Sequence, residues 1–426
     1  MNKVRAGYKM TELGEIPIEW EVKRLEECTN KITDGSHTSP APVEISNYKI
    51  CTVANMKKYK LDLENSTNIS EEDYIRLIKN GCSAERGDVL LSKDGTVGKT
   101  LVYSQSGENI VFLSSIAIIR PQKNILLGEY LNQYLQETKT LERLSNTKTG
   151  SAIKRIVLKD IKNIKIIIPK IQEQERIASI LSTVDEQIDN VDALIEKNKE
   201  LKKGLMQTLL TKGIGHTKFK KTEIGEVPSE WYIKSIDEIT KEVYRYPTYY
   251  GIEYVEEGIA EIRGELLNED ATIKKESFRY ITEKTAKKFP RTKLEGGDIV
   301  ISVRGTIGKV GYITEELAGS NITANLLRVS MNRNIMNEHF VKQLFLSDIM
   351  KRKFDEITTA TTIKTFKVPE FKQIILAIPT KDEQDKIASI LLEVDKKIEE
   401  HENKKQKLEE LKKGLMQQLL TGRIRV

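Results

Sequence analysis

Cysteine is scarce in this chain of 426 residues, and long apolar runs are absent. The three cysteines, Cys28, Cys51 and Cys82, are odd in number and lack the spacing of metal ligands. This usage argues against a disulfide framework or a zinc site, and it fits a reducing compartment. No apolar run approaches the roughly 18–20 residues that span a bilayer, and the first residues lack the apolar core of a signal peptide. We therefore expect a cytoplasmic protein without membrane association.

The sequence also lacks the motifs of enzymes that act on DNA. Its ten prolines include no Pro-Pro pair, which excludes the polar-Pro-Pro-aromatic loop that grips a flipped base during methyl transfer. The segment Gly98-Lys99-Thr100 resembles the end of a phosphate-binding loop, but that motif needs glycine where Lys93 stands. The four histidines form no metal-ligand cluster. We predict no catalytic residue, no metal site and no bound cofactor in this chain.

What the sequence does contain is a long internal repeat. Ile-Ala-Ser-Ile-Leu at residues 177–181 returns at 387–391, and Leu-Lys-Lys-Gly-Leu-Met-Gln at 201–207 returns at 411–417. The offset is 210 residues in both cases, which is far too long for a solenoid. A chain of this length has room for two domains. We therefore expect two copies of one domain-plus-helix unit, related by an approximate twofold axis.

The two copies differ in one region. Residues 87–99 and 297–309 correspond closely, whereas residues 31–40 and 241–250 show no useful similarity. A shared frame with unlike variable segments favours two related readers of two different targets. The alternative is an old duplication that has drifted.

Each copy is predicted to be a mixed α/β (α+β) domain followed by a long helix. Short β-branched runs predict strands at 89–92, 111–119 and 164–168, and at 299–302, 322–329 and 374–378. Helices are expected near 129–137 and 339–347. The resulting segments are a conserved N-terminal segment at 1–20, a domain at 21–168, a helical region at 169–214, a linker and second domain at 215–378, and a second helical region at 379–426.

The two long helices carry a heptad pattern of apolar residues. Its seam in the first helix is Ile177, Leu181, Val184, Ile188, Val191 and Ile195, followed by Asn198, Lys202, Leu205 and Leu209. The simplest interpretation is an antiparallel coiled coil in which each helix is the other's partner. The alternative is that each helix packs on its own domain. Thr380 and Glu383 have capping-box spacing at the start of the second helix.

Several polar segments are suited to DNA, since hydroxyls and cations bind phosphates and base edges. The candidate residues of the first half are Asp34, Ser36, His37, Thr38, Lys93, Lys99, Lys148, Thr149, Ser151, Lys154 and Arg155. Those of the second half are Tyr244, Arg245, Tyr246, Tyr249, Tyr250, Arg304, Lys309, Thr361, Thr362, Lys364 and Lys367. The net charge of +6 allows a nucleic acid partner without requiring one. Each of these residues could equally belong to an ordinary polar surface.

Three motifs together carry a resemblance to a known family. Gly14-Glu-Ile-Pro17 precedes Trp20 and is repeated at 225–231. Pro-x-x-x-Glu-Gln-x-x-Ile occurs at 169–177 and again at 379–387, and Leu-Lys-Lys-Gly-Leu-Met-Gln closes both helices. In this order and duplication, the chain resembles the specificity (S) subunit of type I restriction–modification enzymes over essentially its whole length. The Thr-Asp-Gly-Ser-His stretch at 33–37 also resembles one class of target-recognition domain.

The resemblance implies two target-recognition domains that each read one part of a split, asymmetric site in double-stranded DNA. It implies that the helical regions form a coiled coil that separates the domains and binds two modification subunits. Those subunits would carry S-adenosylmethionine, and two restriction subunits would use ATP and Mg. None of that chemistry would reside in this chain. The other hypotheses are a coiled-coil scaffold with no DNA role and an enzyme whose site is unrecognised.

Overall fold

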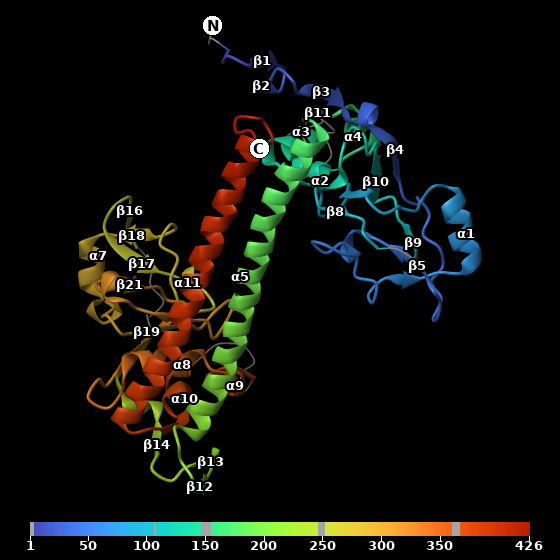
Figure 1. Ribbon diagram of the computed structural model, residues 1–426. Helices are drawn as coiled ribbons and strands as arrows, with labels where there is room; N and C mark the ends of the chain where they lie inside the picture. The colour runs from blue at the N-terminus through green and yellow to red at the C-terminus, as the bar shows by residue number, and fades with distance from the viewer. Residues whose placement is uncertain (1–3, 106–107, 146–154, 246–251, 360–366) are drawn as a thin grey trace. The chain divides into compact units, whose positions relative to one another are not determined.

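The chain divides into two compact units, and each is described by itself. The computed structural model describes residues 4–105, 108–145, 155–245, 252–359 and 367–426. Unit 1 comprises Met1–Asp192 with Asn403–Val426, and unit 2 comprises Ala193–Glu402. The unit boundaries fall inside two long helices, α5 (Ile171–Lys212) and α11 (Lys381–Leu419) (Figure 1). Each unit therefore combines one α/β domain with the first half of one long helix and the second half of the other.

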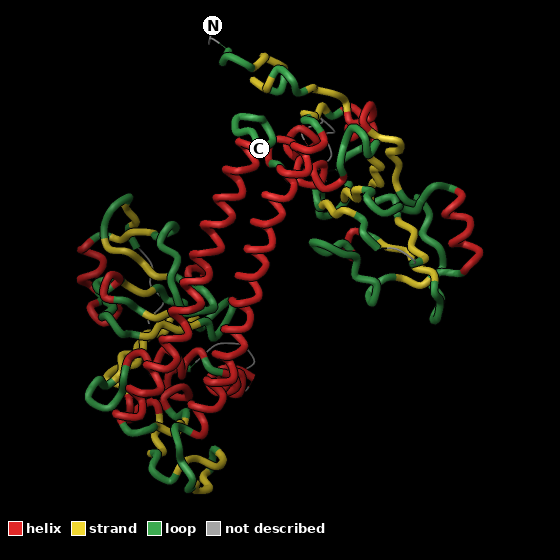
Figure 2. Tube along the Cα trace, viewed as in Figure 1, coloured by secondary structure: helices red, strands yellow, loops and turns green. Residues whose placement is uncertain are grey.

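The α/β domain of unit 1 is built from short strands and helices, coloured by type in Figure 2. In chain order they are β1 (Tyr8–Thr11), β2 (Gly14–Pro17), β3 (Glu21–Arg24), η1 (Leu25–Cys28), β4 (Thr29–Asp34), β5 (Tyr48–Cys51), η2 (Val53–Asn55), β6 (Thr67–Asn68), α1 (Glu71–Lys79), β7 (Val89–Ser92), β8 (Thr100–Val102), β9 (Asn109–Phe112), β10 (Ile116–Pro121), α2 (Gly128–Gln136), α3 (Thr138–Ser145), α4 (Leu158–Asn163) and β11 (Lys165–Ile168).

Unit 2 has a closely matching series. Its elements are β12 (Phe219–Thr222), β13 (Gly225–Pro228), β14 (Tyr232–Ser235), α6 (Ile236–Ile239), β15 (Thr240–Arg245), β16 (Tyr254–Val255), β17 (Ile259–Ile262), η3 (Gly264–Leu266), β18 (Arg279–Ile281), α7 (Glu283–Lys288), η4 (Pro290–Thr292), β19 (Ile299–Ser302), β20 (Val310–Tyr312), η5 (Glu315–Leu317), β21 (Asn321–Ile322), β22 (Leu326–Met331), α8 (Glu338–Leu346), α9 (Asp348–Thr359), α10 (Val368–Lys372) and β23 (Ile375–Ile378).

The sheet topology is shared even where the sequences are not similar. The order β4-β10-β7-β8 in unit 1 corresponds to β15-β22-β19-β20 in unit 2. A second sheet, β6-β5-β9, corresponds to β18-β17-β21, with β16 added at one edge in unit 2. In both of these sheets the last pair is parallel, β5 with β9 and β17 with β21. The variable segments therefore keep one fold and differ in their side chains.

The structure corrects two of the strand predictions. The run 111–119 is not one strand, because β9 ends at Phe112 in one sheet and β10 begins at Ile116 in the other. The run 322–329 is divided in the same way into β21 and β22. Polar residues lie at both breaks, Ser114 and Ser115 at the first and Thr323 and Asn325 at the second, but the apolar pattern on either side does not show that the chain changes sheet. The other predicted strands and both short helices are confirmed within a residue or two.

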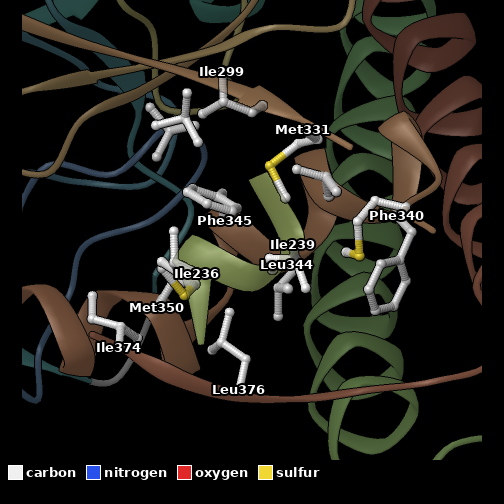
Figure 3. Packing of buried hydrophobic residues seen from close by; sticks show 14 of the residues in the cluster. Ile236, Ile239, Ile299, Met331, Phe340, Leu344, Phe345, Met350, Ile374 and Leu376 are labelled. Atoms are coloured by element: carbon white, nitrogen blue, oxygen red, sulfur yellow. The ribbon is translucent and has the colours of Figure 1, made fainter. Parts of the chain in front are cut away.

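The long helices are part of the hydrophobic core of each unit. In unit 2, Phe340 and Leu344 of α8 pack with Ile299 of β19 and Met331 of β22 (Figure 3). The same cluster takes in Leu209, Leu210, Ile387 and Leu391 from the two long helices. The matching cluster of unit 1 takes in Ile177, Leu181, Leu419 and Leu420. Each fully buried aliphatic side chain contributes about 1.5–3 kcal/mol, so these contacts tie the helix ends firmly to the domain.

Within each unit the two long helices also pair with each other in antiparallel fashion. In unit 1, Asp185 accepts Lys412 Nζ at 2.8 Å, and Asp192 accepts Lys405 Nζ at 2.7 Å. In unit 2, Lys202 Nζ lies 2.6 Å from Asp395 Oδ1. The predicted coiled-coil pairing is confirmed in this sense. The alternative is also partly right, because the helix ends pack on the α/β domains. Among the described residues, no helix is both long and apolar enough to cross a membrane.

Glutamate and glutamine side chains at the start of each long helix hold the frame together. Trp20 Nε1 donates to Glu173 at 2.8 Å, and Trp231 Nε1 donates to Glu383 at 2.9 Å. Because Glu383 also accepts from the backbone N–H of Ile214, its carboxylate holds a tryptophan and a helix end. Glu383, placed by its spacing in a capping box, therefore has a tertiary role in joining the helix to the domain.

The neighbouring glutamine is used identically in the two units. Gln174 accepts from the backbone N–H of Leu127 and donates to the carbonyls of Ile125 and Pro169. Gln384 repeats this with Asn337, Ile335 and Pro379. The Glu-Gln dipeptide of the repeated motif therefore has a structural role in joining helix to domain.

Candidate nucleic-acid interface

The first candidate loop follows β4 and is fixed tightly to β9. A Cβ atom on Gly35 would lie 2.0 Å from the carbonyl oxygen of Phe112, so only glycine fits. The backbone N–H of Ser36 donates to that carbonyl at 2.7 Å, and Ser36 in turn accepts from Ser114. Ser36 is buried, with its hydroxyl donating to the carbonyl of Thr38. This loop is a rigid support that presents the residues after it.

A buried ion pair lies beneath this loop. Lys93 Nζ contacts Asp34 Oδ2 at 2.5 Å, and the Lys93 side chain is only 3% exposed. His37 stands above the pair, 69% exposed, with Nε2 lying 3.4 Å from Asp34 Oδ1. Of the predicted residues here, His37 and Thr38 are on the surface. Lys93 and Ser36 lie below the surface. Their burial indicates that they hold the loop in position and do not themselves contact a ligand.

The matching place in unit 2 carries charge of the opposite sign. Asp34 pairs with Ala117 across its sheet, and Arg245 pairs with Leu327, which lies 210 residues after Ala117. Arg245 therefore occupies the position of Asp34, one residue later than the sequence offset suggested. Val303 is buried where unit 1 has Lys93.

Two predicted cations of unit 2 come together at this strand end. Burial and the nearby Arg304 both lower the pKa of the Arg245 guanidinium. Arg304 itself is exposed on the turn after β19. Arg304, on the β19–β20 turn, is thus close enough to the β15 end to act on the charge of Arg245.

The glycine turns after β7 and β19 connect strands. Ser92 Oγ accepts the N–H of Lys99 at 2.7 Å, and Ser302 Oγ accepts the N–H of Lys309 at 2.9 Å. These two backbone donors are therefore not available to a phosphate. The Lys99 side chain is exposed, whereas Lys309 Nζ donates to the carbonyl of Leu267 at 3.5 Å.

Other predicted residues have ordinary partners or cannot be placed. Arg155 pairs with Asp94 at 3.0 Å, and Lys367 pairs with Glu370 at 3.2 Å. Outside the described residues lie Lys148, Thr149, Ser151, Lys154, Tyr246, Tyr249, Tyr250, Thr361, Thr362 and Lys364. Among the described residues, no group of three or more histidine, cysteine, aspartate or glutamate side chains is placed to hold a metal.

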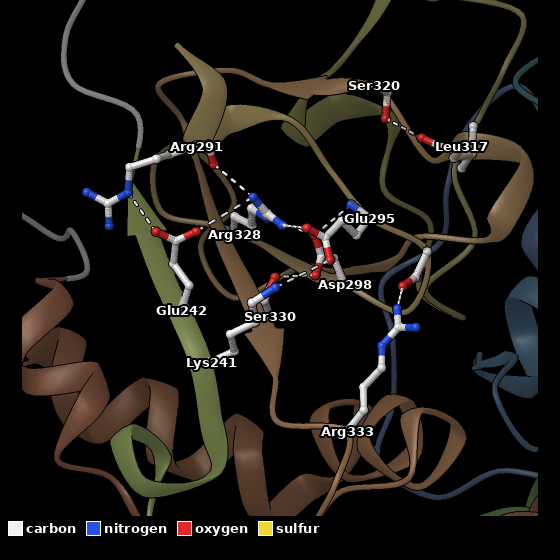
Figure 4. Close-up of polar contacts among 11 residues, drawn as sticks. Lys241, Glu242, Arg291, Glu295, Asp298, Leu317, Ser320, Arg328, Ser330 and Arg333 are labelled. Carbon is white, nitrogen blue, oxygen red and sulfur yellow. Dashed lines mark hydrogen bonds and ion pairs between the residues drawn. The ribbon is translucent and has the colours of Figure 1, made fainter.

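A polar network beside β15 was missed from the sequence. Arg328 of β22 pairs with Asp298 at 2.7 Å and lies 3.4 Å from Glu295 and 3.7 Å from Glu242 (Figure 4). Arg291 Nε contacts Glu242 at 2.6 Å, and its guanidinium carbon lies 4.2 Å from the ring centre of Tyr244. Arg291 and Glu242 are 49 residues apart in the chain. No local motif marks such a contact, so only the strand pairing could have revealed it.

A groove recurs on the shared frame of both units. Its volume is about 370 Å³ in unit 1 and about 360 Å³ in unit 2. In unit 1 its walls include Glu12, Leu13, Lys139, Arg143, Leu420 and Thr421. In unit 2 they include Glu223, Ile224, Arg352, Lys353, Leu210 and Thr211. The groove lies between the N-terminal hairpin, the α3 or α9 helix and the end of a long helix.

Comparison with known proteins agrees with this architecture. The model of the type I restriction modification DNA specificity domain matches twice, at residues 17–201 and 217–410. The type I restriction enzyme MjaIX specificity subunit of Methanocaldococcus jannaschii is 28% identical over 98% of this chain and 96% of that protein. The MjaVIII specificity subunit of the same organism is also 28% identical, over 83% of each chain.

A solved structure shares the fold. The crystal structure of a type I restriction-modification system S subunit from M. genitalium matches with a TM-score of 0.58 and 16% sequence identity. The match covers 96% of this chain and 97% of that one. The structure has two tandem domains and two long helices, and the family model matches the chain twice. The chain therefore belongs to the DNA specificity subunits of type I restriction–modification systems.

Proposed function

We propose that each unit reads one half of an asymmetric, bipartite site in duplex DNA. The observation that carries this proposal is the contrast between a frame with repeated hydrogen bonds and strand ends with unlike charge. Asp34 over buried Lys93 in unit 1 faces one target, and Arg245 beside Arg304 in unit 2 faces another. Base edges in the major groove differ in their donors and acceptors, so unlike side chains select unlike sequences.

We further propose that two modification subunits dock on the frame and bring two restriction subunits with them. The recurring groove supports the number two, because it occurs once in each unit with matching leucine and threonine residues at the helix end. In this proposal S-adenosylmethionine, ATP and Mg are held by those partners. This chain supplies sequence recognition and binds none of them.

A domain exchange tests the proposed division of labour. Residues 21–168 are replaced by the corresponding domain of another family member, and the chain is assembled with its modification subunits. Methylation mapping by sequencing should then show one half-site changed and the other retained. A matched exchange of residues 232–378 should change the opposite half-site. If either exchange altered both half-sites, the modular reading would be wrong.

A scaffold without a DNA role is distinguished by binding alone. A specificity subunit should bind duplex DNA with an affinity that falls steeply as salt rises, because phosphate contacts release counterions. A scaffold should show no such binding.

A further inference from the structure

We propose that Arg291 of unit 2 reads a guanine in one half-site, and this rests on the proposed DNA-reading function. Arg291 lies in η4, and its side chain is 59% exposed. Two contacts fix its guanidinium: the ion pair of Nε with Glu242 at 2.6 Å and stacking on Tyr244 at 4.2 Å. Its backbone is fixed as well, since its carbonyl accepts from Arg328 at 3.1 Å.

The fixed guanidinium leaves its reading edge available. Figure 4 shows Nε directed at Glu242, while the two terminal nitrogens point away from the other labelled residues. Within the described part of the chain, Glu242 is the one side chain that pairs with this guanidinium. Two terminal nitrogens in one plane match O6 and N7 of guanine in the major groove. An arginine held in place before binding loses less conformational entropy when it binds.

The charge around Arg291 favours a base over a phosphate. Its network contains three cations, Lys241, Arg291 and Arg328, and three carboxylates, Glu242, Glu295 and Asp298. A cluster with no net charge attracts the DNA backbone weakly, because phosphate binding depends on excess positive charge. The cluster instead presents the two terminal nitrogens of Arg291 as hydrogen-bond donors for a base edge.

The arrangement of Arg291 with Glu242 and Tyr244 is found in unit 2 and differs from the matching place in unit 1. By strand pairing, the positions of Glu242 and Tyr244 correspond to Lys31 and Thr33 in unit 1. The residue 210 positions before Arg291 is Gly81, and its backbone carbonyl accepts from Lys31 Nζ at 2.8 Å. Contacts that position the backbone are expected to be shared between units, whereas contacts that read bases are expected to differ.

The test is selection of duplexes from a randomised pool by the full chain in complex with its modification subunits. The wild-type complex should select a guanine at a position of one half-site. Arg291→Ala should lower the preference for that guanine by about 5- to 150-fold, the range of a bidentate base contact, and leave all other positions unchanged. Glu242→Gln should lower it less at the same position. Arg279→Ala is the matched control, because Arg279 is exposed in the same unit and lies over Tyr254 at 5.7 Å.

The outcomes separate this proposal from the one it rests on. A wild-type complex that selects no sequence would refute DNA reading and the role of Arg291 together. A wild-type complex whose selected sequence is unchanged by Arg291→Ala would refute the role of Arg291 alone. Uniform weakening for all sequences, with a smaller salt dependence, would make Arg291 a phosphate contact and overturn the proposal. Equal thermal unfolding of variant and wild type shows that a change in preference does not come from misfolding.

Discussion

In unit 1 the strand that supports the candidate loop ends in a buried ion pair, Asp34 with Lys93, whereas unit 2 has Arg245 and Val303 at these positions. Deeper in the frame the two units share key hydrogen bonds: Trp20 donates to Glu173 in unit 1, and Trp231 donates to Glu383 in unit 2. The difference teaches how a duplicated reader diverges. Its internal supports stay similar, whereas the charge at this strand end differs: Asp34 pairs with Lys93 in unit 1, and Arg245 has Arg304 nearby in unit 2.

The buried pair of unit 1 gives the largest expected effect. Lys93→Met leaves the Asp34 carboxylate without its cation, and breaking a buried pair costs about 3–5 kcal/mol. The double variant Asp34→Asn with Lys93→Met should cost clearly less, because no unpaired charge remains. Hydrogen exchange of the β7 and β10 amides measures the stability of unit 1 separately from unit 2.

Lys99→Met is the matched control for these single and double variants, because Lys99 is exposed a few residues further along the same turn. It should change stability by less than about 0.5 kcal/mol. Additive single and double variants would show that Asp34 and Lys93 are not coupled. The contrast with unit 2 would then lose its physical basis.

A second comparison concerns the aspartates where the long helices meet the domains. The Asp185 side chain is 8% exposed and accepts from Lys412 at 2.8 Å and Gln133 at 3.0 Å. Lys58 Nζ also lies 3.5 Å from Asp185, whereas Asp395 contacts a lysine and a glutamine and is 27% exposed. Asp185→Ala should cost about 3 kcal/mol, and Asp395→Ala about 1 kcal/mol because water screens that pair. Hydrogen exchange of the α2 amides measures the loss of stability for Asp185→Ala, and that of the α8 amides measures it for Asp395→Ala. Equal losses would show that burial does not set the strength of these contacts.

The smallest effect is expected from the cysteines, which are all in unit 1. Burial raises the pKa of Cys51 to about 12 and that of Cys28 to about 11. At pH 8 only about one Cys51 thiol in ten thousand is ionised, and the thiolate is the reactive form. Native protein should therefore resist iodoacetamide, with labelling increasing as pH rises toward these values. Mass spectrometry should detect three labels only after unfolding, and rapid labelling of the native chain would contradict the burial.

Much of this architecture could be predicted from the sequence, for a physical reason. The repeat and the heptad seam depend on periodic patterns, which are local, and Ile177 and Leu181 are buried as their spacing predicts. The break between β9 and β10 was missed: Ser114 and Ser115 lie between the buried Phe112 and Ile116, but two serines do not by themselves show that the chain moves to another sheet. Register between these two strands was missed as well: strand pairing matches Arg245 to Asp34, an offset of 211 residues that the Gly14 and Gly225 motifs share.

The candidate site was less predictable than the fold. Residue type identified Asp34, His37 and Lys93 as candidates, and the structure brings them together. It could not show that Lys93 is buried, since a lysine in a turn is ordinarily exposed. Arg291 escaped notice because its partners come from a strand 49 residues earlier. Contacts between segments that are distant in the chain determine which side chains are held at the candidate interface. A single sequence does not show these contacts.

The division of unit 1 between both ends of the chain affects how the protein is made on the ribosome. All of unit 2 lies within Ala193–Glu402, so it can be completed as soon as that stretch has emerged. Unit 1 must wait for Asn403–Val426, which supplies Met416, Leu419 and Leu420 to its core. The delay between the synthesis of Asp192 and that of Val426 is roughly 10 to 50 seconds, at a synthesis rate of about 5–20 residues per second. During this time Trp20 and its neighbours lack their covering helix, which is when a chaperone or a protease would meet them. The unit that is encoded second is the one that is finished first.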